Sequence, residues 1–297
     1  MVMVKFCVES FGNKVEEVAK FCKLCEDLGY DAFYYGDGPW NYLLDCFSTL
    51  SYLSSLTSRI RLGPALSNLF KGYREPIALA KASSTLDNLS KGRFDLRVGC
   101  GANYPKIKEW WLAYGYDYPN SRERVEMLEE GLKIIKNLFL KDRFSFKGKY
   151  FSVLNANLGP KCYQRHIPII VACMGKKMLK IASKYADMAE ISFLRVHEIR
   201  KKIELLNSRL PISLEIDVFI HRDREEALKE AKDYFLRNYL PQDYFDRNLV
   251  GNPEDCLTKL LRYMDAGISQ FTLVFNQRNL DEAVKLFSEK VVSVVKK

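Results

Sequence analysis

Short apolar runs typical of β-strands alternate with amphipathic helical runs along the whole chain, and this alternation limits the folds open to it. The eight strand-like runs are residues 4–10, 31–36, 60–66, 93–99, 167–173, 188–192, 212–220 and 270–275. Helical patterns lie between them or after the last, for example over residues 14–29, 74–89, 121–139 and 279–295. Eight strands that are each followed by a helix are typical of a (β/α)8 TIM barrel rather than an open, doubly wound sheet. We therefore expect a single α/β barrel domain over residues 1–297.

Residues 141–166 interrupt this alternation of strands and helices, between the fourth helix and the fifth strand. Within them, "RFSFKGKYFSV" alternates in polarity and contains a turn signal at Lys147 and Gly148, which predicts a hairpin. Insertions on barrels commonly carry function, so we expect this one to shape the barrel mouth or an interface.

Charged residues alternate along two of the predicted strands. Asp95 and Arg97 share one face of the fourth strand, and Glu215 and Asp217 share one face of the seventh. Strands buried on both faces are usually continuous apolar runs, so these charges should face the barrel interior or its rim. Buried charges require partners, and an interior ion network is favoured over a catalytic role.

The charge and hydropathy of the chain exclude several classes of partner. The 46 Lys and Arg residues exceed the 37 Asp and Glu residues, which leaves a net charge of +9. The basic residues are interleaved with acids, as in "RKKIELLNSR", so we expect an anionic small molecule rather than nucleic acid. No run approaches the ~20 apolar residues of a membrane span. The N-terminus lacks the pattern of a signal peptide, which predicts a cytoplasmic protein without a membrane partner.

The C-x-x-C formed by Cys22 and Cys25 is not read as a metal or redox site. Val15, Val18 and Leu28 share their helical face, so both thiols should lie in the core. No second cysteine pair or histidine cluster completes a zinc site, and we predict no metal.

The three histidines give no sign of acid–base catalysis. His166, His197 and His221 have no evident catalytic partner and are interpreted as surface residues. A barrel without such apparatus indicates that a bound cofactor carries the chemistry.

The active site of a barrel lies at the carboxyl ends of its strands. The residues that the sequence places there are Asp37, Gly38, Pro39, Trp40, Ser67, Asn68, Gly99, Cys100, Gly101, Tyr104, Ala172, Cys173, Met174, Gly175, Lys176, Lys177, Glu190 and Ser192. "VGCGANY" allows close backbone approach to a flat ligand, although a lone G-x-G is a weak signal. In "CMGKKMLKIASKY", Gly175 opens a turn before a helix whose free N–H groups, with Lys176 and Lys177, form a candidate anion site.

Five blocks in the same order resemble the bacterial luciferase-like superfamily of flavin- and deazaflavin-dependent oxidoreductases. They are "CKLCEDLGYDAFYYGD", "RIRLGPALSN", "TLDNLSKGRFDLRVGCG", "IPIIVACMGKKMLKIASKYADMAEIS" and "VGNPEDCLTKLLRYMDAGISQFTL". Within the superfamily, "GPALSN" is most similar to the G-P-G-V-T-N of methylene-tetrahydromethanopterin reductases. These enzymes use coenzyme F420 (F-420), an 8-hydroxy-5-deazaflavin.

The resemblance implies that the cofactor ring lies across the barrel mouth. Asp37, the implied catalytic residue, would lie near its polar edges with Ser67 and Asn68. Gly99, Cys100 and Gly101 would lie along the ring, and a non-proline cis peptide at Ala65–Leu66 would lie under it.

Ala172 and Cys173 would also contact the cofactor, and Met174, Gly175, Lys176 and Lys177 would hold its phosphate. The resemblance further implies a homodimer. Trp40, Tyr104, Trp110 and Trp111 suggest a flat or apolar substrate, although they could equally be packing residues.

Two positions depart from the family pattern. Many members carry Asp-His or Glu-His where this chain has Asp37-Gly38, and the missing side chain is expected to open space over the ring, with Trp40 as a wall. Cys100 replaces an arginine that grips the FMN phosphate in luciferases, which favours F420 over FMN.

The sequence therefore predicts hydride transfer between F420 and a small organic substrate. The alternatives are an FMN-dependent monooxygenase, a non-catalytic flavin-binding protein, and a cofactor-free barrel acting on sugar phosphates.

Overall fold

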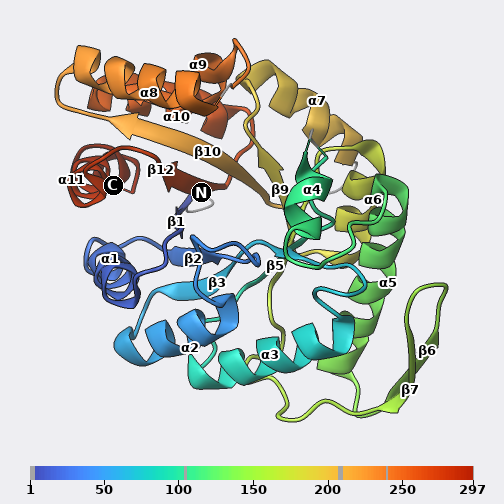
Figure 1. The fold of residues 1–297 in the computed structure, drawn as a ribbon. Helices are drawn as coiled ribbons and strands as arrows, with labels where there is room; N and C mark the ends of the chain where they lie inside the picture. Colours follow the sequence, from blue (N-terminus) through green and yellow to red (C-terminus); the bar gives the residue numbers. More distant parts are fainter. Residues whose placement is uncertain (1–3, 104–105, 207–209, 239, 297) are drawn as a thin grey trace.

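Parallel strands form a nearly closed barrel in the computed structural model, which describes residues 4–103, 106–206, 210–238 and 240–296. Along the sheet the order is β3-β2-β1-β12-β10-β9-β8-β5-β4. The barrel strands are β1 (Lys5–Ser10), β2 (Ala32–Gly36), β3 (Arg61–Ala65), β4 (Ser67–Asn68), β5 (Leu96–Gly99), β8 (Ile169–Ala172), β9 (Met188–Ser192), β10 (Ile212–Ile220) and β12 (Gln270–Phe275). Every predicted strand is present, and the predicted barrel is confirmed (Figure 1).

The third predicted strand is present as two pieces, and together they close the barrel. β3 meets the start of the next strand through a parallel bridge between Leu62 and Phe94, while β4 pairs with β5. Leu66 separates the two pieces, and the Ala65–Leu66 peptide is cis, as predicted. The break turns the chain at the carboxyl end of the barrel, the face called here the barrel mouth.

Helices surround the barrel (Figure 1). They are α1 (Val15–Asp27), α2 (Cys46–Leu56), α3 (Pro76–Leu89), α4 (Ile107–Leu112), α5 (Ser121–Leu140), α6 (Lys176–Tyr185), α7 (Val196–Leu206), α8 (Arg224–Asn238), α10 (Pro253–Asp265) and α11 (Leu280–Phe287). The predicted last helix ends in a π-helical turn, η1 (Ser288–Val292), and a short α12 (Ser293–Val295). Among the described residues, no helix has both the length and the apolar character needed to cross a membrane.

Cys22 and Cys25 lie on the core face of α1, and both thiols are fully buried and free. This position confirms the interpretation of the C-x-x-C as packing. Burial raises the pKa of both thiols, which disfavours the thiolate that redox or metal chemistry needs.

The predicted hairpin is present, but it does not shape the mouth. β6 (Phe144–Lys147) and β7 (Ser152–Ala156) pair antiparallel, with Gly148 N–H donating to the carbonyl of Phe151 across the turn. A segment that joins a helix to the next strand lies at the amino ends of the strands, at the opposite end of the barrel from the mouth. The hairpin packs along α5, where Glu130 accepts hydrogen bonds from the backbone of Lys149, Tyr150 and Phe151.

The structure adds one short segment that the sequence analysis missed. α9 (Tyr244–Arg247) leads into β11 (Leu249–Gly251), which pairs with the outer half of β10. α8, α9 and α10 gather over this end of β10 (Figure 1). Three residues are too few for a periodic signal, so the strand is not recognisable from sequence alone.

Buried ion pairs hold the barrel interior together, as predicted for the fourth strand. Arg97 is fully buried, and its Nη2 lies 2.6 Å from Oε1 of Glu9 and 2.5 Å from Oε1 of Glu190. Asp95 binds Arg61 at 2.6 Å and accepts a hydrogen bond from the Tyr34 hydroxyl. The seventh-strand acids behave differently, since Glu215 and Asp217 line cavities at the mouth.

We predict that Arg97→Met lowers the free energy of unfolding by about 3–5 kcal/mol, because it leaves two buried carboxylates without their cation. Arg122→Met is the matched control: Arg122 pairs with Glu126 on the surface of α5, and its loss should cost at most about 1 kcal/mol. Urea unfolding of both variants measures the difference. Equal, small losses would contradict a structural role for the buried guanidinium.

Candidate active site at the barrel mouth

A cavity of about 720 Å³ opens at the barrel mouth. This volume lies within the range of small-molecule and cofactor sites, ~300–1,000 Å³. Its described lining residues are Glu9, Phe11, Asp37, Trp40, Ala65, Leu66, Asn68, Gly99, Cys100, Gly101, Ala102, Asn103, Ile107, Trp111, Ser121, Ala172, Cys173, Met174, Gly175, Met178, Ser192 and Glu215. The set contains no lysine or arginine, so a ligand here meets backbone, amide and hydroxyl groups, carboxyls and apolar surface.

A cluster of three glutamates, called here the three-glutamate floor, lies at the base of the mouth cavity, and two of them, Glu9 and Glu215, line it. Carboxyl oxygens of Glu9, Glu190 and Glu215 lie within 4.8 Å of one another. The Arg97 guanidinium is the cation that contacts two of these residues, Glu9 and Glu190. Burial, together with the charges of Glu9 and Glu190, raises the pKa of Glu215 well above its usual value. Glu215 accepts a hydrogen bond of 2.7 Å from the Ser192 hydroxyl. The base of the cavity therefore presents a carboxyl whose surroundings favour its protonated form.

Asp37 lies at the cavity wall with both carboxylate oxygens already engaged. It accepts hydrogen bonds from Ser67 Oγ at 2.5 Å, from the Tyr73 hydroxyl at 2.8 Å and from Arg74 Nε at 3.0 Å. Arg74 Nη2 completes a bidentate ion pair at 2.5 Å. Four donor atoms from three side chains fix this carboxylate in place.

The space above Gly38 is filled by Trp40 rather than left open. A Cβ atom at position 38 would lie 2.0 Å from Cζ3 of the Trp40 indole. That ring stacks on Tyr42 and meets Trp111 edge to face at 5.3 Å. The expectation of free space over the cofactor ring is therefore wrong. The predicted wall is present, because Trp40 lines the cavity.

Glycines form the opposite wall, and a buried arginine braces it. A Cβ at Gly99 would lie 2.6 Å from Cδ1 of Leu66, and Gly101 has a left-handed φ of 83°. Arg124 Nε donates to the carbonyl of Cys100 at 2.8 Å, and its Nη2 donates to the carbonyl of Ala102 at 2.9 Å. The sequence analysis missed Arg124, although an arginine on the apolar stripe of a predicted helix is a recognisable signal.

The start of α6 faces the same cavity through Gly175. A Cβ at this residue would meet no atom within 4 Å, so the backbone is open to a ligand. Gly175 is the N-cap, and its carbonyl accepts the first helical bond from Leu179 N–H. The N–H groups of a first helical turn have no intrahelical partner and attract anions.

The structure brings most of the predicted site residues together. Ala65, Leu66, Asn68, Gly99, Cys100, Gly101, Ala172, Cys173, Met174 and Gly175 all line the cavity, as do Asp37 and Trp40. Ser67 lies behind the wall and is fully buried against Asp37.

Three predicted residues lie elsewhere among the described parts of the chain. Lys176 and Lys177 are exposed and do not line the cavity. The side chain of Trp110 is 47% exposed, whereas the neighbouring Trp111 is buried and lines the cavity in its place. Tyr104 lies outside the described residues.

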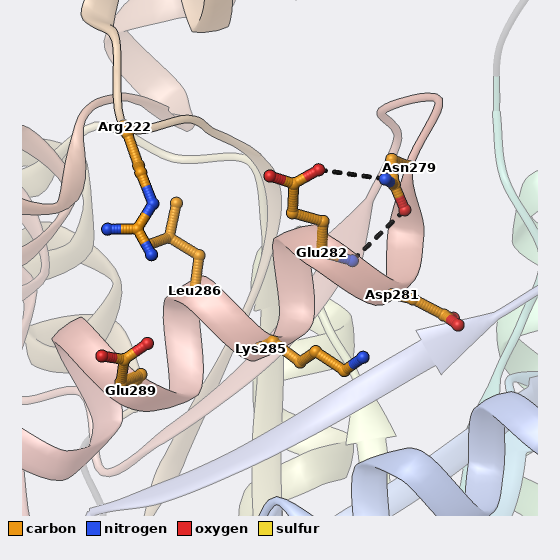
Figure 2. Close-up of a pocket in the computed structure, with 7 residues that line it drawn as sticks. All are labelled: Arg222, Asn279, Asp281, Glu282, Lys285, Leu286 and Glu289. Atoms are coloured by element: carbon orange, nitrogen blue, oxygen red, sulfur yellow. Dashed lines mark hydrogen bonds between the residues drawn. The ribbon is translucent and has the colours of Figure 1, made fainter.

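A separate depression of about 420 Å³ lies beside α11, away from this site (Figure 2). Charged side chains of both signs line it, and Glu282 accepts a hydrogen bond from Asn279 Nδ2 at 3.0 Å. It shares no lining residue with the mouth cavity, and its described lining contains no aromatic ring.

Comparison with known proteins gives a family match over most of the chain. The model of the family described as luciferase-like monooxygenase matches residues 5–270. The F420-dependent glucose-6-phosphate dehydrogenase of Amycolatopsis mediterranei is 24% identical, covering 97% of this chain and 96% of that protein. The pyrimidine monooxygenase RutA of Serratia proteamaculans is 28% identical over 50% of this chain and 39% of its own length.

Solved structures share the fold over nearly the whole chain. The coenzyme F420-dependent tetrahydromethanopterin reductase of Methanopyrus kandleri superposes with a TM-score of 0.85, at 18% identity and 99% coverage of both chains. An F420-dependent secondary alcohol dehydrogenase, solved with an F420–acetone adduct, gives a TM-score of 0.83 at 18% identity. It covers 98% of this chain and 99% of that one.

We predict that Gly38→Ala destabilises the protein by about 1–3 kcal/mol, since the added methyl group must displace a packed indole ring. The same substitution in a Trp40→Ala background should be nearly neutral. Urea unfolding of the two single variants and the double variant gives the coupling energy between the sites. Additive losses would show that Gly38 is required for a reason other than the ring.

Proposed function

This chain belongs to the luciferase-like monooxygenase family, and we propose that it is an oxidoreductase that uses coenzyme F420 for hydride transfer to or from a small organic substrate. The observation that carries the proposal is the mouth cavity, where the Ala65–Leu66 turn, the Gly99 wall and the start of α6 converge. The full-length match to an F420-dependent dehydrogenase supports the choice of cofactor.

The cavity fits a flat cofactor that carries a phosphate. The indole N–H of Trp40 is buried at the cavity wall without a hydrogen-bond partner among the described residues, so it can donate to a polar edge of a ligand. The open position at Gly175 leaves room for a phosphate beside the free N–H groups of α6. F420, when bound, supplies a ring carbon that accepts or donates a hydride.

We assign the following roles to the residues of this chain. The backbone of Gly175 and the first turn of α6 bind the phosphate, with Lys176 and Lys177 contributing long-range charge from outside the cavity. Leu66 and Gly99 support the ring. Asp37 contacts the polar edge of the cofactor as a fixed negative charge, since its oxygens are held by Ser67, Tyr73 and Arg74.

An FMN-dependent monooxygenase is the second candidate, favoured by the match between half of this chain and a pyrimidine monooxygenase. Cys100 counts against it, because luciferases grip the FMN phosphate with an arginine at this position. The homodimer and the cytoplasmic location stay predictions.

We expect Gly175→Val to weaken F420 binding about tenfold or more with little change in thermal stability. Gly175 has φ −93° and ψ 159°, a conformation that valine adopts readily, and a Cβ atom at this position meets no atom within 4 Å. Gly175→Ala provides a graded control with a smaller effect. Cofactor titration and thermal unfolding of both variants separate the two properties. A parallel fall in stability and binding would indicate a folding role for Gly175.

Parallel titrations with F420 and FMN decide the cofactor. F420 carries a phosphodiester and a glutamate tail, so we expect a protein of net charge +9 to bind it more tightly than FMN. Because exposed charges are screened within about 8–10 Å, added salt should raise the Kd for F420 more than the Kd for FMN. Tighter binding of FMN, with oxygen consumption after reduction, would favour the monooxygenase. FMN binding without turnover would favour a non-catalytic flavin-binding protein, and binding of neither would favour a cofactor-free barrel.

A further inference from the structure

A second cavity, of about 550 Å³, adjoins the mouth cavity. Phe11 and Glu215 line both, so the two spaces meet at these side chains. The other described lining residues come mainly from the ends of β9, β10 and β12 and from α8 and α9. They are Tyr42, Phe193, Asp217, Tyr234, Leu240, Pro241, Tyr244, Arg247, Asn248, Val274 and Asn276. The second cavity therefore lies on the same face as the proposed cofactor site.

Aromatic rings cover much of its wall. Phe11 and Tyr42 are large side chains left exposed at the mouth, and Tyr234 and Tyr244 line the cavity from α8 and α9. Exposed aromatic side chains gathered around a cavity are typical of ligand sites, because a ligand can remove their apolar surface from water. This lining suits an apolar or aromatic molecular body.

The only cation in the described lining, Arg247, is already neutralised. Its Nη2 lies 2.5 Å from Oδ2 of Asp243, and its Nε donates to the same oxygen at 2.7 Å. Nη1 donates to the carbonyl of Phe193. A phosphate group that entered this cavity would find no described cation free to bind it.

The acids of the cavity are, in contrast, not neutralised by cations. Asp217 accepts hydrogen bonds of 2.6 Å from the Tyr244 hydroxyl and from Asn276 Nδ2, which are neutral donors. Burial raises the pKa of Asp217 to about 6, so the carboxylate still carries its charge at pH 7.5. Glu215 lines the second cavity and also belongs to the three-glutamate floor, where Arg97 supplies the only described guanidinium.

We infer that this second cavity is the substrate chamber and that Asp217 makes it selective for uncharged or cationic substrates with an apolar or aromatic body, excluding phosphate esters. This inference rests on the proposed function, because it assigns to the second cavity the substrate that the mouth cavity would oxidise or reduce. Like charges brought together in a partly desolvated site repel, which excludes a dianion that lacks a counter-cation.

Three probes that share a benzyl group and differ in the charge of their polar group test this selectivity in the purified full-length protein. Benzyl alcohol is neutral, benzylamine is a cation, and benzyl phosphate is an anion at pH 7.5. Ligand-detected NMR titration at low salt gives their affinities without substrate turnover. The titrations are run with and without F420, because the start of α6 attracts a phosphate when the mouth cavity is empty. We expect benzyl alcohol and benzylamine to bind, and benzyl phosphate to bind about tenfold or more weakly. Equal or tighter binding of benzyl phosphate would overturn the inference.

Asp217→Asn locates the effect in the cavity, because the amide retains the size of the carboxylate and removes its charge. We expect the affinity for benzylamine to fall about fivefold or more and that for benzyl phosphate to rise, with little change for benzyl alcohol. Asp281→Asn makes the same charge change in the depression beside α11 and should leave all three affinities unchanged. Equal effects of the two variants would show that the selectivity comes from overall charge rather than from this cavity.

The outcomes separate this inference from the proposed function. If F420 fails to bind while the probes show the expected order, the cofactor assignment is wrong and the selectivity of the cavity stands. If F420 binds while benzyl phosphate competes equally with the other probes, the cofactor assignment stands and the substrate class is wrong.

Discussion

The guanidinium of Arg97 is the interaction on which the mouth of this barrel depends. It joins Glu9 on β1 to Glu190 on β9 from its own position on β5, and it lies 4.3 Å from the centroid of the Tyr34 ring on β2. Four strands thus share one buried charge. Without it, the carboxylates beneath the cavity would have to be neutral or hydrated, and the floor would lose its fixed geometry.

The ion network also gives the acidic residues at the mouth different partners. Glu9 and Glu190 contact the cation, whereas Glu215 does not. Burial raises the pKa of both Glu9 and Glu215, and the charges of Glu9 and Glu190 raise the pKa of Glu215 further. Asp37 lies in a different environment, because Arg74 and two hydroxyl groups bind its oxygens. Carboxyls at one mouth therefore differ in their partners, because Asp37 is paired with a guanidinium whereas Glu215 accepts a hydrogen bond from a neutral hydroxyl.

The sequence predicts the barrel and much of its mouth, because strand periodicity places Asp37, Asn68, Gly99 and Gly175 at strand ends. It fails where the outcome depends on side-chain direction. One position along a helix rotates a side chain by about 100°, which is why Trp111 rather than Trp110 reaches the cavity. Lys176 and Lys177 point outward for the same reason. The partners of Asp37 could not be found, since Arg74 meets it only after the loops fold together.

The contact between Gly38 and the Trp40 indole has a consequence for the history of this site. A side chain at position 38 and an indole at position 40 cannot share the space that one of them fills. A relative with a larger residue at position 38 would therefore have to place residue 40 elsewhere or carry a smaller one. The two positions are expected to change together, and restoring a histidine by a single substitution would meet a steric barrier that its chemistry does not predict.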